Sequence, residues 1–181
     1  EPIQQAGIAV KSLEMAAGFP DPIRLLKLAN LLGSFKPDVL QTWMYHADLA
    51  GGLAARLAGR FPVIWGIRNN ALIPGASKPR TVRIVRQLAR FSKWLPYRIV
   101  SCSIAAQAMH VGLGYSPGKF VVIPNGFDLE RFKPDPAARR DVRNELGLEG
   151  GALLVGLVAR FDPNKDHQNF IQAARILLER Q

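Results

Sequence analysis

Short apolar runs alternate with longer helical patterns along most of this sequence, and this alternation constrains the fold more than any other feature. The runs are about four to eight residues long and rich in Val and Ile, as buried strands are. Such alternation is typical of a parallel sheet covered by helices. We therefore predict an α/β fold, a Rossmann-like parallel sheet with helices on both faces. Strands are predicted at 7–10, 39–42, 63–66, 99–102, 120–123 and 153–159, and helices at 22–34, 45–58, 79–94, 103–112, 136–146 and 166–179.

A polar, Pro- and Gly-punctuated stretch near residues 129–151 predicts a boundary between two domains. We place the first domain at 1–130, and a linker with the start of a second domain at 131–181. The chain opens at Glu1-Pro2 without an initiator Met and ends inside a helical pattern, which predicts a segment of a longer protein. Apolar surface left uncovered in such a segment favours self-association into a homo-oligomer.

The charge balance predicts an anionic partner. Lys and Arg number 24 against 14 Asp and Glu, which gives a net charge of +10 and a pI near 10.4. Phosphate, nucleic acid and an anionic lipid surface all fit that charge. A basic Rossmann-like module that binds nucleic acid or another polyanion therefore remains the alternative function. Because no nucleic-acid-binding motif is present and the aromatic residues lie mostly in apolar runs, we expect no nucleic-acid partner.

Two cations flank the turn in "GLVARFDPNKDHQNF", residues 156–170. Arg160 ends a predicted strand, and Lys165 directly precedes a predicted helix. In open α/β sheets ligands bind beyond the carboxyl ends of strands, where helix N-termini also attract anions. A guanidinium and an ammonium at such a place suit a diphosphate. The alternative is an ordinary loop whose two cations are simply solvated.

The segment "IPNGFD" predicts a turn at the domain junction. Asn125 and Gly126 tolerate positive φ and so favour a tight turn after the strand at 120–123. Asp128 is predicted to cap the turn that follows. We interpret these three residues as structural rather than ligand-binding.

Three longer stretches together resemble one enzyme family. "FVVIPNGFDLERFKPD" and "LLVGLVARFDPNKDHQNFIQAARILLE" resemble the domain junction of family-4 (group-1) glycosyltransferases of the GT-B fold. "FKPDVLQTWMYHADLAGGLAARLAGRFPVIWGIRN" resembles the middle of that family's first domain. The resemblance implies a partial GT-B fold. Residues 1–130 would be the N-terminal, acceptor-side domain lacking its first strands, and 131–181 the linker and truncated start of the nucleotide-sugar-binding domain.

The same resemblance implies a reaction. A hexosyl group would move, with retention of anomeric configuration, from a nucleotide-diphosphate-sugar to a glycan or lipid-linked acceptor, as in polysaccharide biosynthesis. Arg160 and Lys165 would hold the donor diphosphate and stabilise the charge of the leaving group. No cofactor or obligatory metal is implied, and no metal-binding motif such as HExxH or CxxC is present. The family's paired glutamates and its glycine-rich loop are absent, so we expect the chain alone to be inactive.

Three residues are candidates for catalysis on the acceptor side. His46 and Asp48 follow a predicted strand; a His there can position an acceptor hydroxyl or receive its proton. Alternatively, either residue simply caps the helix at 45–58. Arg68 stands where many family members carry a His. Because its guanidinium stays protonated, Arg68 cannot serve as a base, but it can hold a phosphate or a carboxylate.

The segment "RTVRIVRQLARFSKWLPYR" predicts an amphipathic helix with one basic face. Trp94 lies at the border of that face, and a basic face edged by an aromatic suits an anionic membrane surface. The alternative is a solvated face over a buried apolar stripe. With the resemblance, this pattern predicts a cytoplasmic protein, peripheral on the inner membrane face. The cations of this face are Arg80, Arg83, Arg86, Arg90 and Lys93.

Overall fold

A computed structural model describes residues 2–14, 21–59, 61–69, 79–149 and 151–180. The chain divides into two compact units, Glu1–Asn125 and Gly126–Gln181. We refer to them as unit 1 and unit 2, and each is described by itself.

The centre of unit 1 is a parallel sheet, which confirms the predicted α/β class. Among the described residues it holds four strands in the order β1-β2-β3-β4. The register pairs Trp43 with Gly66, and Ile67 with Ser101. Each strand lies within two residues of its predicted position, because a buried parallel strand carries its own apolar signal. The strands are β1 (Leu40–Trp43), β2 (Val63–Ile67), β3 (Arg98–Ser101) and β4 (Phe120–Val122).

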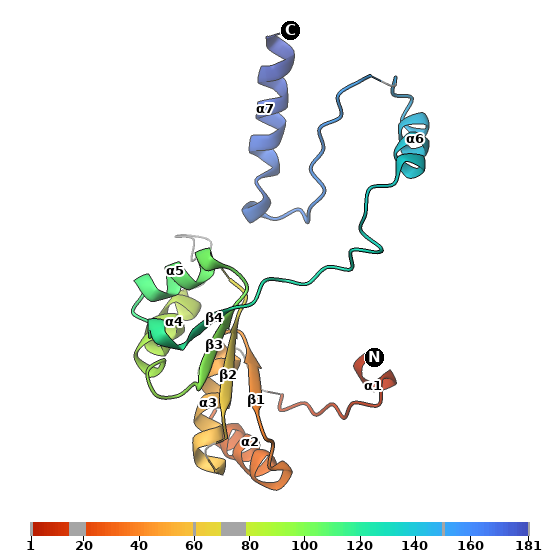
Figure 1. Cartoon of the computed structure of the whole chain (residues 1–181). Coiled ribbons are helices and arrows are strands. Elements are labelled where there is room, and N and C mark those ends of the chain that lie inside the picture. The colour runs from red at the N-terminus through yellow and green to blue at the C-terminus, as the bar shows by residue number, and fades with distance from the viewer. Residues whose placement is uncertain (1, 15–20, 60, 70–78, 150, 181) are drawn as a thin grey trace. The chain divides into compact units, whose positions relative to one another are not determined.

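Helices α3, α4 and α5 connect these strands and cover one face of the sheet (Figure 1). The strand order steps in one direction, and right-handed crossovers then place successive connecting helices on the same side. Helix α2 packs on α3. Asp21 caps the N-terminus of α2, and Lys36, in a left-handed conformation with φ 49°, caps its C-terminus. The bounds are α2 (Pro22–Phe35), α3 (Tyr45–Ala58), α4 (Pro79–Phe91) and α5 (Ile104–Gly112), with a 3₁₀ turn η1 (Pro117–Lys119) before β4.

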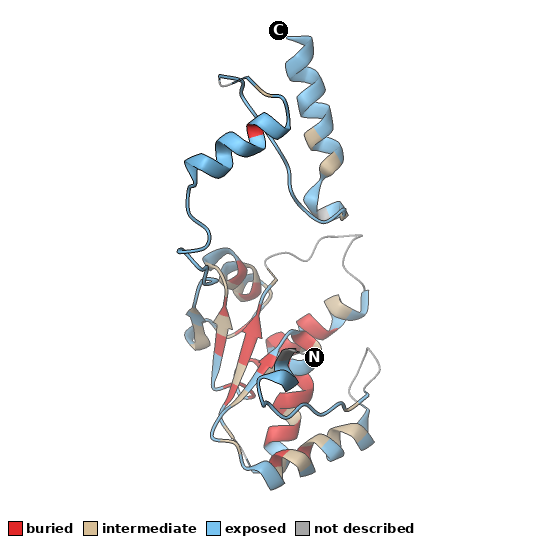
Figure 2. Ribbon diagram, turned by 90° about the vertical axis from the view of Figure 1, so that its right-hand side faces the viewer, coloured by how far each residue is buried: buried red, intermediate tan, exposed pale blue. Residues whose placement is uncertain are grey.

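The core of unit 1 lies between this helix layer and the sheet (Figure 2). Trp65 of β2, Leu49 of α3 and Leu88 of α4 are fully buried there. Burial of one such side chain contributes roughly 1.5–3 kcal/mol. The opposite face of the described strands is less covered, because Trp43 and Val121 are 50% and 41% exposed. The candidate residues of unit 1 are thus carried by a well-packed scaffold.

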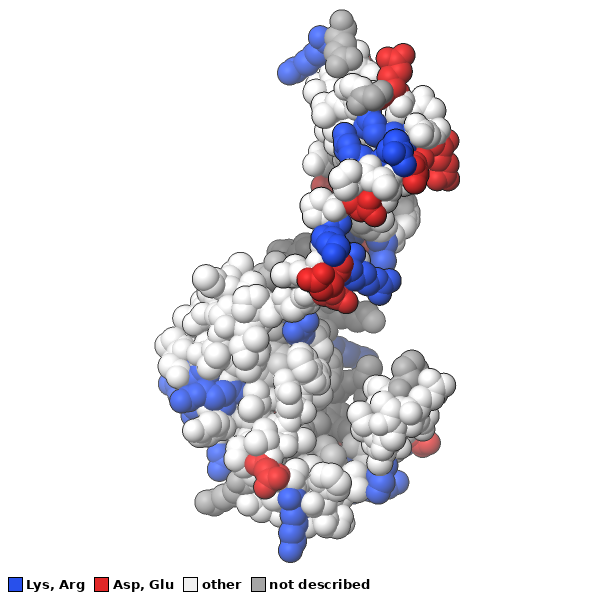
Figure 3. Space-filling view, turned by 45° about the vertical axis from the view of Figure 1, so that its right-hand side comes forward, with Lys and Arg blue, Asp and Glu red and all other residues white. Residues whose placement is uncertain are grey.

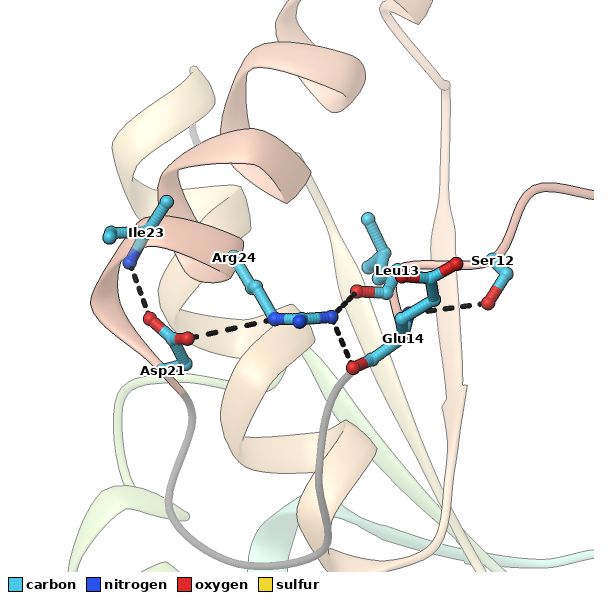
Figure 4. A network of polar contacts seen from close by, with 6 residues as sticks. All are labelled: Ser12, Leu13, Glu14, Asp21, Ile23 and Arg24. Carbon is cyan, nitrogen blue, oxygen red and sulfur yellow. Dashed lines mark hydrogen bonds and ion pairs between the residues drawn. The ribbon is translucent and has the colours of Figure 1, made fainter.

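The predicted strand at 7–10 is wrong. A short helix α1 (Pro2–Gln5) comes first, and the residues after it form no strand. A strand needs a neighbour with which to exchange hydrogen bonds, and among the described residues β1 pairs only with β2. The end of the segment that follows α1 is bound to α2. Arg24 of α2 donates to the Leu13 carbonyl oxygen at 2.6 Å and to the Glu14 carbonyl oxygen (Figure 4). Asp21 accepts from the Ile23 amide at 2.9 Å and lies 3.6 Å from the Arg24 guanidinium.

Unit 2 contains α6 (Pro136–Glu145), a 3₁₀ turn η2 (Pro163–Lys165) and α7 (His167–Glu179). The predicted strand at 153–159 is also wrong, because these residues form no regular structure and Leu153 and Val158 are almost fully exposed. Within unit 2 the described residues offer no second strand for pairing. Residues before this segment are held by Arg143, which donates to the carbonyl oxygens of Glu149 and Ala152.

Candidate functional site at the carboxyl edge of the sheet

The carboxyl ends of β1 and β2 bring Trp43 and Arg68 together. Because the strands are parallel and in register, the residues that follow them meet at one edge of the sheet. The guanidinium carbon of Arg68 lies 5.4 Å from the centre of the Trp43 ring, a cation–π contact that holds an exposed cation in place. His46 is partly exposed, in the first turn of α3, which follows β1. The structure thus places two of the three predicted acceptor-side residues, His46 and Arg68, at this edge, with Trp43 as a residue that sequence reasoning missed.

The backbone between β1 and α3 has an unusual conformation at Met44. Its φ of 72° and ψ of 156° lie in a region that is nearly restricted to glycine. The Met44 amide donates to the Gly66 carbonyl oxygen at 3.2 Å, so the connection is held against β2. A side chain at Gly66 would lie 2.8 Å from the Thr42 carbonyl oxygen and 2.8 Å from the Trp43 ring. The glycine at position 66 therefore permits the close approach of β1 and β2 that sets this edge.

Asp48 is buried beneath the edge rather than presented at it. Asp48 is only 1% exposed, and its carboxyl group accepts a hydrogen bond from the Thr42 hydroxyl at 2.6 Å. Burial raises the pKa of this carboxyl to about 8, against the opposing effects of the Thr42 hydroxyl and the Gly66 backbone. Asp48 therefore ties α3 to β1. It does not cap α3, and neither does His46: the cap residue is Met44, which makes no side-chain capping bond.

A second buried polar contact links α3 to α5. The Tyr45 hydroxyl lies 3.0 Å from Nε2 of His110, and Nδ1 of His110 lies 2.7 Å from the Ala106 carbonyl oxygen. Because a carbonyl can only accept, Nδ1 carries the proton, and Nε2 accepts from the Tyr45 hydroxyl. Burial lowers the pKa of His110 and raises the pKa of Tyr45 to about 12, so both groups are neutral at pH 7. The sequence signal for Tyr45 was its place next to His46 at the start of α3.

The predicted donor-binding cations lie in unit 2. Arg160 is exposed in the irregular segment after residue 151, and Lys165 ends the turn η2. Neither forms an ion pair with a described residue. Helix α7 begins after Asp166, which has a φ of 50° and accepts from the Asn169 amide at 3.3 Å. A hollow of about 310 Å³ opens at this end of α7, lined by Phe161, Asp162, Pro163, Asp166, His167 and Gln168 rather than by the two cations.

The predicted junction turn differs from expectation. Neither Asn125 nor Gly126 has a positive φ, and residues 123–128 form no regular turn. The turn comes later, where Asp128 Oδ1 accepts from the amides of Glu130 and Arg131 at 3.1 and 3.0 Å. Asp128 therefore caps the following turn as predicted. Among the described residues no strand follows β4, so no hairpin requires a reversal at the Asn-Gly pair.

The basic face predicted for α4 is present. Arg80, Arg83, Arg86 and Arg90 are exposed, while Ile84 and Leu88 are buried on the opposite side of the helix. Lys93 is also exposed but follows the end of α4. None of the helices in the described part of the chain combines the length and apolar composition that a membrane crossing requires.

The charge of the two units differs strongly. Residues 1–125 contain 15 of the 24 Lys and Arg but 5 of the 14 Asp and Glu, so the net charge of +10 belongs to unit 1. In unit 2 acidic and basic side chains lie close together (Figure 3). In the described ranges no three His, Cys, Asp or Glu side chains are grouped so that they could hold a metal ion. The excess of positive charge is therefore a property of unit 1, whereas unit 2 is balanced overall.

Comparison with known proteins identifies the family. Residues 7–131 match the model of Glycosyltransferase Family 4. The chain belongs to that family. Over 164 residues it is 30% identical to the UDP-Gal:alpha-D-GlcNAc-diphosphoundecaprenol alpha-1,3-galactosyltransferase of Escherichia coli, covering 86% of this chain. Over 148 residues it is 31% identical to the D-inositol 3-phosphate glycosyltransferase of Nocardiopsis dassonvillei, covering 79% of this chain.

Solved structures confirm the fold of this family-4 chain. It is similar to Anabaena HepE crystallised with UDP-glucose, with a TM-score of 0.71, 21% identity and coverage of 96% of this chain and 45% of HepE. The HepE complex with UDP and glucose gives a TM-score of 0.67 at 21% identity, over 84% of this chain and 39% of HepE. This chain spans 40% of the Escherichia coli relative and 34% of the Nocardiopsis relative.

Proposed function

We propose that this family-4 chain forms part of a hexosyltransferase that moves a sugar from a nucleotide-diphosphate-sugar to a glycan or lipid-linked acceptor, with retention of anomeric configuration. The observation that carries the proposal is the family match over residues 7–131. The name of the Escherichia coli relative supports a UDP-sugar donor and a lipid-linked acceptor. HepE, crystallised with UDP-glucose, supports the same donor class.

Within unit 1, the carboxyl edge of the sheet is the proposed acceptor side. His46 is partly exposed there and is the group that positions the acceptor hydroxyl or receives its proton. Arg68, held over Trp43, supplies a fixed cation for a phosphate or carboxylate of the acceptor. Asp48 is proposed as a positioning residue, because its bond to Thr42 orients the first turn of α3, on which His46 lies.

Within unit 2, Arg160 and Lys165 are the proposed ligands of the donor diphosphate. Both side chains are exposed and neither is neutralised by an ion pair in the described part of the chain. Fixed cations aimed at a leaving diphosphate stabilise the negative charge that builds in the transition state. No metal or cofactor has a part in this proposal.

The proposed place of action is the cytoplasmic face of a membrane, in polysaccharide or glycolipid synthesis. The exposed arginines of α4 would meet anionic headgroups, each contributing about 1 kcal/mol near the surface. A lipid-linked acceptor requires such contact, and the diphosphoundecaprenol named for the Escherichia coli relative is of that kind.

Donor binding is the direct test. Saturation-transfer NMR with UDP-glucose and UDP-galactose should show transfer to the nucleotide for the 181-residue chain. The double variant Arg160→Ala/Lys165→Ala should weaken the affinity at least tenfold, since a hydrogen bond to a charged group is worth about 1.5–3 kcal/mol. The charge-matched control Lys133→Ala/Arg139→Ala, also in unit 2, should bind like the parent chain.

Four results would contradict the proposal or a part of it. Equal loss in both double variants would indicate general charge attraction, and unchanged binding in the first would exclude the two cations. Stronger binding of random oligonucleotides than of UDP-sugars, with steep salt dependence, would favour the polyanion-binding alternative. We expect no sugar transfer by these 181 residues alone, and measurable turnover would contradict that part.

A further inference from the structure

A cationic hollow lies at the edge of the sheet where the strands begin, opposite the carboxyl edge. Its volume is about 420 Å³. Arg56 in the last turn of α3, Arg98 at the start of β3, and Lys119 directly before β4 converge on it. The amino and carboxyl ends of parallel strands lie at opposite edges of a sheet. The hollow is therefore separate from the edge that carries His46 and Arg68.

The local contacts fix two of these cations in place. Arg56 donates to the Trp94 carbonyl oxygen, and Lys119 donates to the Pro96 carbonyl oxygen at 2.6 Å. Both bonds go to the single connection between α4 and β3, so the two cations are held against the same loop. The third cation, Arg98, lies over the Tyr97 ring at 5.1 Å. A loosely solvated group of surface cations would not share partners in this way.

Among the described residues that line the hollow, none supplies an acidic counter-charge. None of its lining residues is Asp or Glu, and none of the three cations forms an ion pair with a described residue. Partial burial lowers the pKa of Lys119, and repulsion from Arg56 and Arg98 lowers it further. The dipole of α3 favours a cation at Arg56, in the last turn of that helix, but gives no reason for Arg98 or Lys119. Three like charges without a lining acid therefore suit an anionic ligand.

The remaining walls of the hollow are apolar and aromatic, and the three cations together indicate the kind of anion that fits. Phe61, Pro62 and Pro96 supply an apolar wall, and Trp94 and Tyr97 beside it are exposed, at 49% and 63%. Two guanidinium groups and an ammonium together match a phosphate better than a single carboxylate, because a phosphate has more charged oxygens to share among them.

We propose that Arg56, Arg98 and Lys119 form a binding site for a phosphate group, distinct from the carboxyl-edge site. The phosphate is either that of a lipid headgroup at a membrane surface or that of a small soluble compound. The site does not depend on the proposed transferase activity, since it uses none of the residues assigned to donor or acceptor.

The experiment uses the whole 181-residue chain in two arms. In the first, inorganic phosphate is titrated at constant ionic strength against chloride, and backbone amide shifts are followed by NMR. In the second, sedimentation measures binding to phosphatidylcholine vesicles with and without phosphatidylglycerol. The test variant is Arg98→Gln/Lys119→Gln, and the matched control is Lys11→Gln/Lys27→Gln, which removes two exposed cations elsewhere in unit 1. Arg98→Gln alone serves if the Lys119 change disturbs folding, because Arg98 is exposed.

The expected result is saturable binding that the test variant weakens at least tenfold and the control changes less than twofold. Amide shifts should centre on residues 94–98 and 119. Binding of inorganic phosphate would assign a soluble source, and binding only to phosphatidylglycerol vesicles would assign a lipid headgroup. The proposal is overturned if neither arm shows binding, if the control loses as much affinity as the test variant, or if the shifts centre on residues 43–46 and 68.

Discussion

Replacing Asp48 with Asn should remove a specific pH dependence of stability. The folded carboxyl has a pKa raised by burial to about 8, while an unfolded Asp titrates near 3.8. Between these values the folded chain holds one proton that the unfolded chain has lost. Protonation therefore favours the folded state, so the contribution of Asp48 to stability is fully present at low pH and falls as the pH rises towards 8.

The magnitude follows from the one proton involved. A difference of one bound proton changes the free energy of unfolding by about 1.4 kcal/mol per pH unit. Between pH 5 and pH 7, both inside the window, the parent chain should lose about 3 kcal/mol relative to Asp48→Asn. The Asn side chain can still accept a hydrogen bond from the Thr42 hydroxyl. Any altered contact with Gly66 changes the free energy of unfolding of the variant by an amount that does not depend on pH.

Urea denaturation at pH 5, 6 and 7, followed by tryptophan fluorescence, measures this difference. Trp65 is fully buried in unit 1 and reports on the unit that holds Asp48. Other titrating groups occur in both chains and cancel in the comparison. If the free energies of unfolding of the parent chain and of Asp48→Asn changed equally with pH, the inference that the buried carboxyl is neutral in the folded protein would be refuted.

Two further predictions concern the packing around α3. Gly51→Ala places a methyl group 2.5 Å from the Thr42 side chain and should destabilise unit 1 by roughly 1–3 kcal/mol. In Gly33→Ala, on α2, the nearest neighbour of the new methyl group lies at 3.8 Å, so the gain in helix propensity should stabilise unit 1 by about 0.5–1 kcal/mol. Thermal denaturation of both variants checks the pair, and equal effects would contradict it. The His110 imidazole should stay neutral to a lower pH than an exposed His in an NMR titration, so its contribution to stability should fall as the pH drops below about 6.5. Its replacement by Phe should remove that fall, at a cost of about 1 kcal/mol for the acceptor that Tyr45 loses; an ordinary titration of His110 would disprove the assigned burial.

Local patterns were enough to predict most of the elements. The strands of unit 1 and the helices at 22–34, 45–58, 103–112, 136–146 and 166–179 lie within two residues of their predicted ends, and α4 ends three residues early. Apolar period and capping residues such as Asp21, Ser103 and Asp135 are properties of neighbouring residues, so they can be read without the fold. The cationic face of α4 follows from the same helical period.

Tertiary structure decided what depends on partners far along the chain. Residues 7–10 and 153–159 have the composition of strands but form none, because a strand also requires a neighbour to share its hydrogen bonds. Asp48 has the sequence position of a reactive carboxylate, yet the register of β1 against β2 brings Thr42 and Gly66 around it and buries it. The contact between Arg68 and Trp43 and the convergence of Arg56, Arg98 and Lys119 likewise exist only once parallel strands align their ends. Sequence determined which segments are helical or extended and which family the chain resembles, whereas the environment of each charged group was set by the packing of distant segments.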